Sequence, residues 1–175
     1  MENDFYTDRL ALTKLTPADA EFIFELVNTA EWIKFIGDRN IKTMADSHNY
    51  IERIVGNSNI VYWIVKLKDS LTATGIITFI KRDYLDHHDI GFAFLPQFAR
   101  KGYAYEAAKI ILDNVMNNCI HKVILATTIV ENKNSIRLLT KLGFHFMKEI
   151  TPDKEKLLVY STGEPGKESI KCDHR

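Results

Sequence analysis

Between residues 90 and 117 the sequence passes from an apolar run through a short basic turn into a helical pattern, and this segment constrains the fold most. Pro96 ends the run, because proline has no N–H for a strand ladder and keeps the preceding residue extended. Gly102 stands where the turn becomes a helix, and without a side chain it lets backbone N–H groups converge. A helix start flanked by Arg100 and Lys101 is a candidate pyrophosphate site. An ordinary strand-to-helix connection with solvated basic residues explains the segment equally well.

Composition narrows the class of protein. The chain has 175 residues, of which 46% are hydrophobic and 26% charged, as in a soluble domain with its own core. Its 23 basic and 23 acidic residues cancel, which argues against a dedicated nucleic-acid binder. There is no long apolar run and no basic-then-apolar leader, so we expect no membrane partner. Cys119 and Cys172 have no metal-like spacing and imply no disulfide framework, which predicts a reducing, cytoplasmic compartment.

Hydrophobic periodicity predicts a mixed α/β domain over residues 1–161, followed by a loose polar tail over 162–175. The predicted strands are 9–15, 60–67, 71–81, 88–95, 122–130, 145–150 and 155–161. The predicted helices are 16–28, 31–35, 43–56, 103–117 and 132–142. Two helix ends have clear signals: Thr43 with Asp46 begins one helix, and Gly143 is placed for a left-handed cap of another.

Three blocks of residues, in this order, resemble the GCN5-related N-acetyltransferase (GNAT) superfamily, and within it the RimJ/RimL-like branch. The blocks are Thr7-Asp-Arg-Leu-Ala-Leu12 with Asp19-Ala20; Asp89-Ile-Gly91 with Pro96-Gln-Phe-Ala-Arg-Lys-Gly-Tyr-Ala-Tyr-Glu-Ala107; and Asn132-Lys-Asn-Ser135 with Lys141-Leu-Gly-Phe144. The resemblance implies a mostly antiparallel sheet whose two central strands splay apart, flanked by helices. It also implies transfer of an acetyl group from acetyl-CoA to a primary amine within a ternary complex, without a metal.

The resemblance also assigns residues to the cofactor. The pantetheine would pair with the strand at Phe92, Phe94 and Leu95, and with Asn132. The pyrophosphate would lie on the turn and helix start formed by Arg100, Lys101, Gly102, Tyr103 and Ala104.

The chain departs from the family pattern at three positions. Ala99 stands where Gln or Arg is usual, and Arg100 replaces the branch's Gly before Lys. Leu139 stands where many relatives have a Tyr that protonates the departing thiolate. The thiolate's proton must then come from Ser135, from water, or from no residue of the protein.

Acetyl transfer requires a neutral amine, so a base must take the amine's proton, directly or through water. Asp89 is the candidate base, and a structural carboxylate is the alternative. Ser135 would lie near the thioester sulfur, or would merely cap its helix. Asp38 and Arg39 are candidate acceptor contacts. His88 is a third candidate, although solvated loop histidines are commoner.

Three functions remain open. The acceptor is a peptide or protein α-amino group, which the branch favours, or it is a small amine. Alternatively the chain is a non-catalytic coenzyme-A-binding sensor or interaction module, because Ala99 and Leu139 depart from the pattern. The chain is a monomer or a homodimer.

Overall fold

The computed structural model describes residues 4–117, 121–152 and 155–163. They form one open sheet with the strand order β1-β2-β3-β4-β5-β6-β8-β7. The strands are β1 (Phe5–Tyr6), β2 (Leu10–Lys14), β3 (Ile60–Leu67), β4 (Ala73–Ile80), β5 (Asp89–Phe94), β6 (Leu125–Thr128), β7 (His145–Ile150) and β8 (Leu157–Ser161). The helices are α1 (Ala20–Val27), α2 (Ala30–Phe35), α3 (Met44–Val55), α4 (Tyr103–Asn117) and α5 (Lys133–Lys141), with 3-10 turns at Pro17–Asp19 and Pro96–Phe98.

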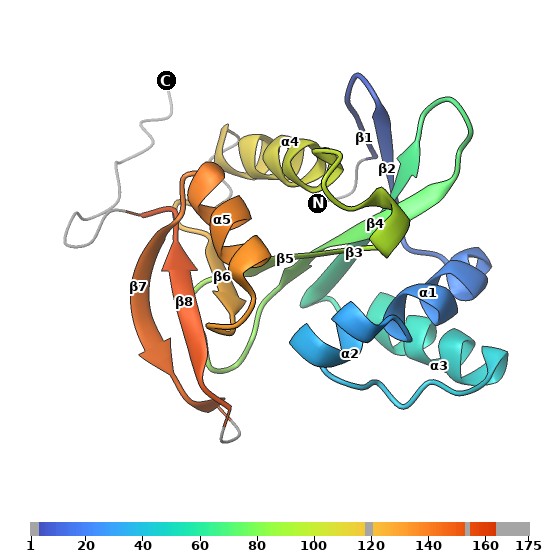
Figure 1. Ribbon diagram of the computed structural model, residues 1–175, viewed down its shortest axis with the longest axis horizontal. Helices are drawn as coiled ribbons and strands as arrows, with labels where there is room; N and C mark the ends of the chain where they lie inside the picture. Colours follow the sequence, from blue (N-terminus) through green and yellow to red (C-terminus); the bar gives the residue numbers. More distant parts are fainter. Residues whose placement is uncertain (1–3, 118–120, 153–154, 164–175) are drawn as a thin grey trace.

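Helices cover both faces of the sheet (Figure 1). On one face α4 and α5 enclose a core that includes Trp63, Phe79 and Ile111. On the other face α1, α2 and α3 pack on a second core around Ile23, Ile51 and Ile64. Side chains alternate between the two faces along a strand, so each strand residue of the site faces either α4 and α5 or α1, α2 and α3.

The strands β1 to β5 follow one another as antiparallel neighbours, whereas β5 and β6 are parallel and are linked through α4. Within the described residues, the β5–β6 pairing holds at Asp89↔Leu125 alone, and the strands then diverge (Figure 1). The mixed, mostly antiparallel sheet and its splayed centre are confirmed.

Most predicted elements are present with shifted ends. The strand predicted from residue 71 starts at Ala73, because Leu71 adopts a left-handed φ of 56° in the turn. The helix predicted from residue 16 opens with a 3-10 turn before α1. The strand predicted over 122–130 is shorter, because β6 extends only over Leu125–Thr128. Strand β1 was not predicted at all.

Both predicted helix caps are confirmed. The hydroxyl of Thr43 accepts from the backbone of Asp46, whose carboxylate accepts from Thr43 N at 2.9 Å. At the end of α5, Gly143 has a φ of 91° and donates to the Thr140 carbonyl. Phe144 N donates to the Leu139 carbonyl at 3.0 Å, which completes a Schellman motif that packs Phe144 against Leu139.

The start of the predicted tail is bonded to the sheet. Thr162 N donates to the Ile124 carbonyl at 3.0 Å, and Gly163 N donates to the Ser161 hydroxyl at 3.0 Å. Residues 164–175, with Cys172, and residues 118–120, with Cys119, lie outside the described part of the chain. In the described part, no helix has the length and apolar character needed to cross a bilayer, and no cluster of His, Cys, Asp and Glu is suited to a metal.

Candidate functional site

The edge of β5 that faces β6 is open to a ligand's amide groups. Leu125 N donates to the His88 carbonyl, so backbone groups of even-numbered residues face β6. Phe92 and Phe94 therefore direct N–H and C=O groups into the splay, as the resemblance implies. Leu95 differs: its N–H donates to Thr74 O at 2.9 Å and its carbonyl accepts from Phe98 N. We therefore leave Leu95 out of the cofactor site, because both its backbone groups already have protein partners.

The turn after β5 is shaped by two left-handed residues, Arg100 with a φ of 61° and Gly102 with a φ of 83°. Helix α4 begins at Tyr103. Among the described residues, none accepts a hydrogen bond from the backbone N–H of residues 100–104. A run of unpaired N–H groups at a helix start is a concave donor surface for an anion. Arg100 and Lys101, both exposed, add positive charge there.

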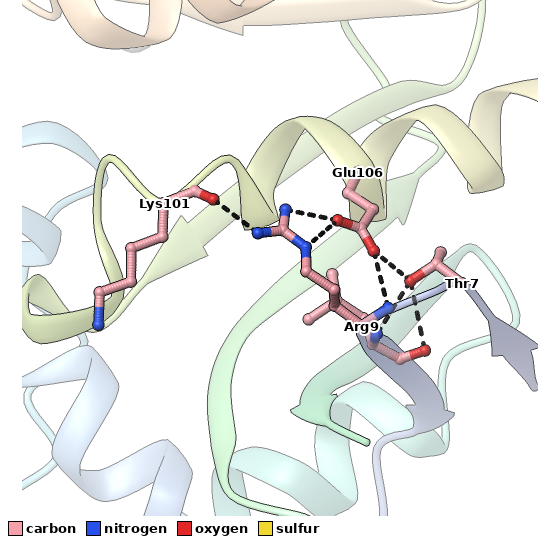
Figure 2. Close-up of polar contacts among 5 residues, drawn as sticks. Thr7, Arg9, Lys101 and Glu106 are labelled. Atoms are coloured by element: carbon pink, nitrogen blue, oxygen red, sulfur yellow. Dashed lines mark hydrogen bonds and ion pairs between the residues drawn. The ribbon is translucent and has the colours of Figure 1, made fainter. Parts of the chain in front are cut away.

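A side-chain clamp from the N-terminal segment holds this turn (Figure 2). Arg9 Nη1 donates to the Lys101 carbonyl at 3.1 Å, and Arg9 Nε donates to Glu106 Oε2 at 2.8 Å. The Thr7 hydroxyl donates to the other carboxylate oxygen, Oε1, at 2.6 Å. The Arg9 guanidinium also lies 4.7 Å from the centre of the Tyr103 ring.

Gly102 lies beside the clamp. A Cβ on Gly102 would lie 3.4 Å from Arg9 Nη2, an ordinary contact with the end of a flexible side chain. The left-handed φ of 83°, and not lack of space, is therefore what favours glycine at this position.

Asp89 is buried at the one rung that joins β5 to β6, and its side chain faces the α1–α3 layer. Both carboxylate oxygens accept from Arg82 Nε at 3.0 Å, and Oδ2 also accepts from the Thr127 hydroxyl at 3.2 Å. Burial raises the pKa of Asp89, and the charge and hydrogen bond of Arg82 offset only part of that rise. Asp89 is therefore both structurally paired and more basic than a solvated aspartate.

A group of phenols and guanidinium groups lies on the same face as Asp89. The hydroxyls of Tyr50 and Tyr62 are 3.5 Å apart, and Tyr62 is next to Thr78, which is next to Gly91 on β5. Burial and the Tyr50 phenol raise the pKa of Tyr62, while the nearby charges of Arg39 and Arg82 act against that rise. Arg39 thus lies on the same side of the sheet as Tyr62 and Asp89.

His88 lies on the opposite face. Its ring stacks on Phe79, with centroids 4.9 Å apart, and lies 4.3 Å from the ring of His121. Burial and the neighbouring His121 lower the pKa of His88. The structure therefore does not bring His88 together with Arg39. Asp38 accepts a hydrogen bond from Asn40 N at 2.7 Å and shapes the loop that carries Arg39.

Asn132 and Ser135 lie at the start of α5. Asn132 is the N-cap, because its Oδ1 accepts from Ser135 N at 3.1 Å. The Ser135 hydroxyl takes no part in this cap and has no hydrogen-bond partner among the described residues. Leu139, which replaces the family's Tyr, is buried in the core under α4. Ser135 thus remains available for a ligand, whereas Leu139 does not.

Three charged residues near the site were not predicted from the sequence. Arg82 has no motif of its own and is revealed only by its contact with Asp89. Arg9 and Glu106 each lie in one of the sequence blocks that resemble the GNAT superfamily, and the resemblance assigns neither residue a role. That is the only sequence signal for their pairing.

Comparison with known proteins agrees with this geometry. Residues 9–145 match the model of the acetyltransferase (GNAT) domain. The chain is 30% identical over 151 residues to the uncharacterized N-acetyltransferase YnaD of Bacillus subtilis, covering 83% of this chain and 86% of that one.

Solved structures also match. A GNAT-family acetyltransferase from Bacillus anthracis has a TM-score of 0.77 at 25% identity, over 91% of this chain and 97% of that one. The microcin C7 self-immunity acetyltransferase MccE, in complex with acetyl-CoA and AMP, has a TM-score of 0.77 at 20% identity, over 89% and 92% of the two chains. The chain therefore belongs to the GNAT family of acetyltransferases and is an N-acetyltransferase.

Proposed function

We propose that this enzyme binds acetyl-CoA along the open edge of β5 and on the turn at residues 100–104, and transfers the acetyl group directly to a primary amine. The proposal is supported by one continuous row of backbone groups that have no hydrogen-bond partner among the described residues. The outward backbone groups of Phe92 and Phe94 lead to the unpaired N–H groups of the turn. Pantetheine amides suit the first set of groups, and a pyrophosphate suits the second.

In the transfer, the amine nitrogen attacks the thioester carbonyl carbon, the C–S bond breaks, and the amine loses one proton while the CoA thiolate gains one. Asp89 takes the amine's proton through a water molecule, since Arg82 already donates to both carboxylate oxygens. Its raised pKa favours this role. The free hydroxyl of Ser135 lies on the thiolate side and orients the leaving sulfur, while the Nδ2 amide of Asn132 binds the pantetheine.

The acceptor approaches from the α1–α3 side, where Asp89 faces. The side chains placed there are the guanidinium groups of Arg39 and Arg82 and the phenols of Tyr50 and Tyr62. Such a wall disfavours a polycation and suits an amine that also carries a carboxylate or carbonyl oxygen. We therefore favour a peptide α-amino group, as in the RimJ/RimL-like branch, over a polyamine.

The first experiment measures thermal unfolding with acetyl-CoA, with desulfo-CoA and with ATP. A ligand at about a hundred times its Kd stabilises the fold by about 2.7 kcal/mol, which is readily seen as a shifted Tm. Thiol release is then measured with short peptides, with the same peptides N-terminally blocked, and with spermidine. No shift with millimolar acetyl-CoA would overturn the cofactor site. Release with spermidine and none with free peptide would overturn the acceptor.

Asp89→Asn tests the base. We expect turnover to fall and acetyl-CoA affinity to stay the same, because Asp89 begins β5 whereas the turn follows the other end of that strand. Thr127→Val is the matched control, since it removes a hydrogen bond to Asp89 and keeps the carboxylate. Intact turnover in Asp89→Asn would make Asp89 a structural residue.

A further inference from the structure

The guanidinium of Arg9 connects the N-terminal hairpin to the turn before α4 across 92 residues of sequence (Figure 2). Its Nε and Nη2 meet Glu106 Oε2 at 2.8 and 2.6 Å, while Nη1 reaches the Lys101 carbonyl. Arginine's rigid, planar fork allows one side chain to make both contacts at once, which the single ammonium of a lysine does not match.

The hairpin itself is tightly fixed, so Arg9 is a firm anchor. Leu10 N donates to the Thr7 hydroxyl, and Thr7 N donates to the Leu10 carbonyl at 2.9 Å. The Arg9 carbonyl accepts from Lys68 N at 2.9 Å, and the Arg9 N–H donates to Glu106 Oε1. Backbone and side chain of Arg9 are therefore both held from several directions.

The Lys101 carbonyl and the Gly102 N–H belong to one planar trans peptide group, in which they point in opposite directions. Because Arg9 binds the carbonyl, the Gly102 N–H is turned away from Arg9. The unpaired N–H groups of Tyr103 and Ala104 follow directly at the start of α4.

We propose that Arg9, held by Glu106, is a positioning residue that fixes the Lys101–Gly102 peptide so that the Gly102 N–H faces the pyrophosphate of acetyl-CoA. The inference rests on the proposed cofactor site. It gives a role to Arg9 and Glu106, which take no part in the proposed acetyl transfer. Arg9 acts through the peptide, since its own charge is already paired with Glu106.

The test compares two acetyl donors, acetyl-CoA and S-acetyl-pantetheine, the second of which lacks the pyrophosphate. We expect Arg9→Gln and Arg9→Lys each to raise KM for acetyl-CoA about tenfold, the effect of one lost charge-assisted hydrogen bond. The values of kcat, and kcat/KM for S-acetyl-pantetheine, should not change. Arg53→Gln on α3 is the matched control, because this exposed arginine is bonded, within the described part of the chain, only to Asn49 O of its own helix.

Other outcomes overturn the proposal. An equal loss with both donors would mean that Arg9 supports the fold alone. Wild-type behaviour of Arg9→Lys would mean that charge suffices without the fork. Glu106→Gln should also weaken acetyl-CoA binding; tighter binding would mean that a released Arg9 contacts phosphate itself.

A second variant leaves Arg9 itself in place. Thr7→Val removes the hydroxyl that donates to Glu106 and accepts from Leu10 N, and it should raise KM for acetyl-CoA less than Arg9→Gln does. An unchanged KM in every variant, with normal turnover by the wild type, would refute the role of Arg9 and leave the proposed function standing. Failure of the wild type to bind acetyl-CoA would instead refute the proposed function.

Discussion

The left-handed backbone at Arg100 predicts a gain in stability from a substitution in the turn itself. Arg100 has a φ of 61° and an exposed side chain, at a position where the branch has glycine. A residue with a Cβ is destabilised by about 1–2 kcal/mol in this conformation. Glycine avoids this strain, but it loses more conformational entropy on folding, which costs about 0.5–1 kcal/mol. The free energy of unfolding should therefore be about 0.5–1 kcal/mol higher for Arg100→Gly than for Arg100→Ala.

The comparison between these variants holds the charge constant, because both remove the guanidinium. In a chain of this size the difference corresponds to a Tm about 2 °C higher for Arg100→Gly, measured by calorimetry. Arg137 in the exposed part of α5 supplies the matched control. There Gly should be about 1 kcal/mol less stable than Ala, because the site is helical.

Equal Tm values for the two Arg100 variants, or a lower Tm for Gly, would refute the claim that this turn is strained. Binding provides the second readout. Both variants should bind acetyl-CoA a few-fold more weakly at low salt, and the deficit should shrink as ionic strength rises.

The remaining predictions concern a helix cap and two titrations. Gly143→Ala should lower stability by about 0.5–1 kcal/mol through its left-handed φ alone, because a Cβ there meets no other atom; chemical denaturation measures this. Burial would raise the pKa of Glu106, but hydrogen bonds from Thr7 and Arg9 lower it, so its stabilising contribution is present above the ordinary Glu pKa and lost in acid. The acid limb of Tm against pH should therefore be shallower for Glu106→Gln. Burial and His87 lower the pKa of His121, so its contribution is present above the ordinary His pKa and is lost on acidification. His121→Asn should flatten the fall in Tm from pH 7 to pH 5; an unchanged slope would show that His121 does not titrate with folding.

The sequence predicted those features that depend on neighbours along the chain. The Schellman cap at Gly143 and the capping box at Thr43 are local, since their partners lie within a few residues. The start of α4 after Gly102 is local for the same reason. The donor surface of the turn could therefore be placed from sequence alone.

Features that depend on tertiary contacts could not be predicted. The Arg82–Asp89 pair follows from the path of a loop, and the Arg9–Glu106 pair joins segments 97 residues apart. The separation of His88 from Arg39 follows from strand alternation, which depends on register. Leu95 lost its predicted role because its two backbone partners were set by the fold.

The lone rung between β5 and β6 has a mechanical consequence. It divides the backbone network into two ladders, β1 to β5 and β6 to β7, that are joined by the core under α4 more than by the sheet. Amide protons on the two sides need not exchange together, because one ladder can open while the other stays closed. If acetyl-CoA binds along β5 as proposed, its pantetheine amides would make the hydrogen bonds that β6 does not make there. The cofactor would then stabilise the sheet as an added strand does.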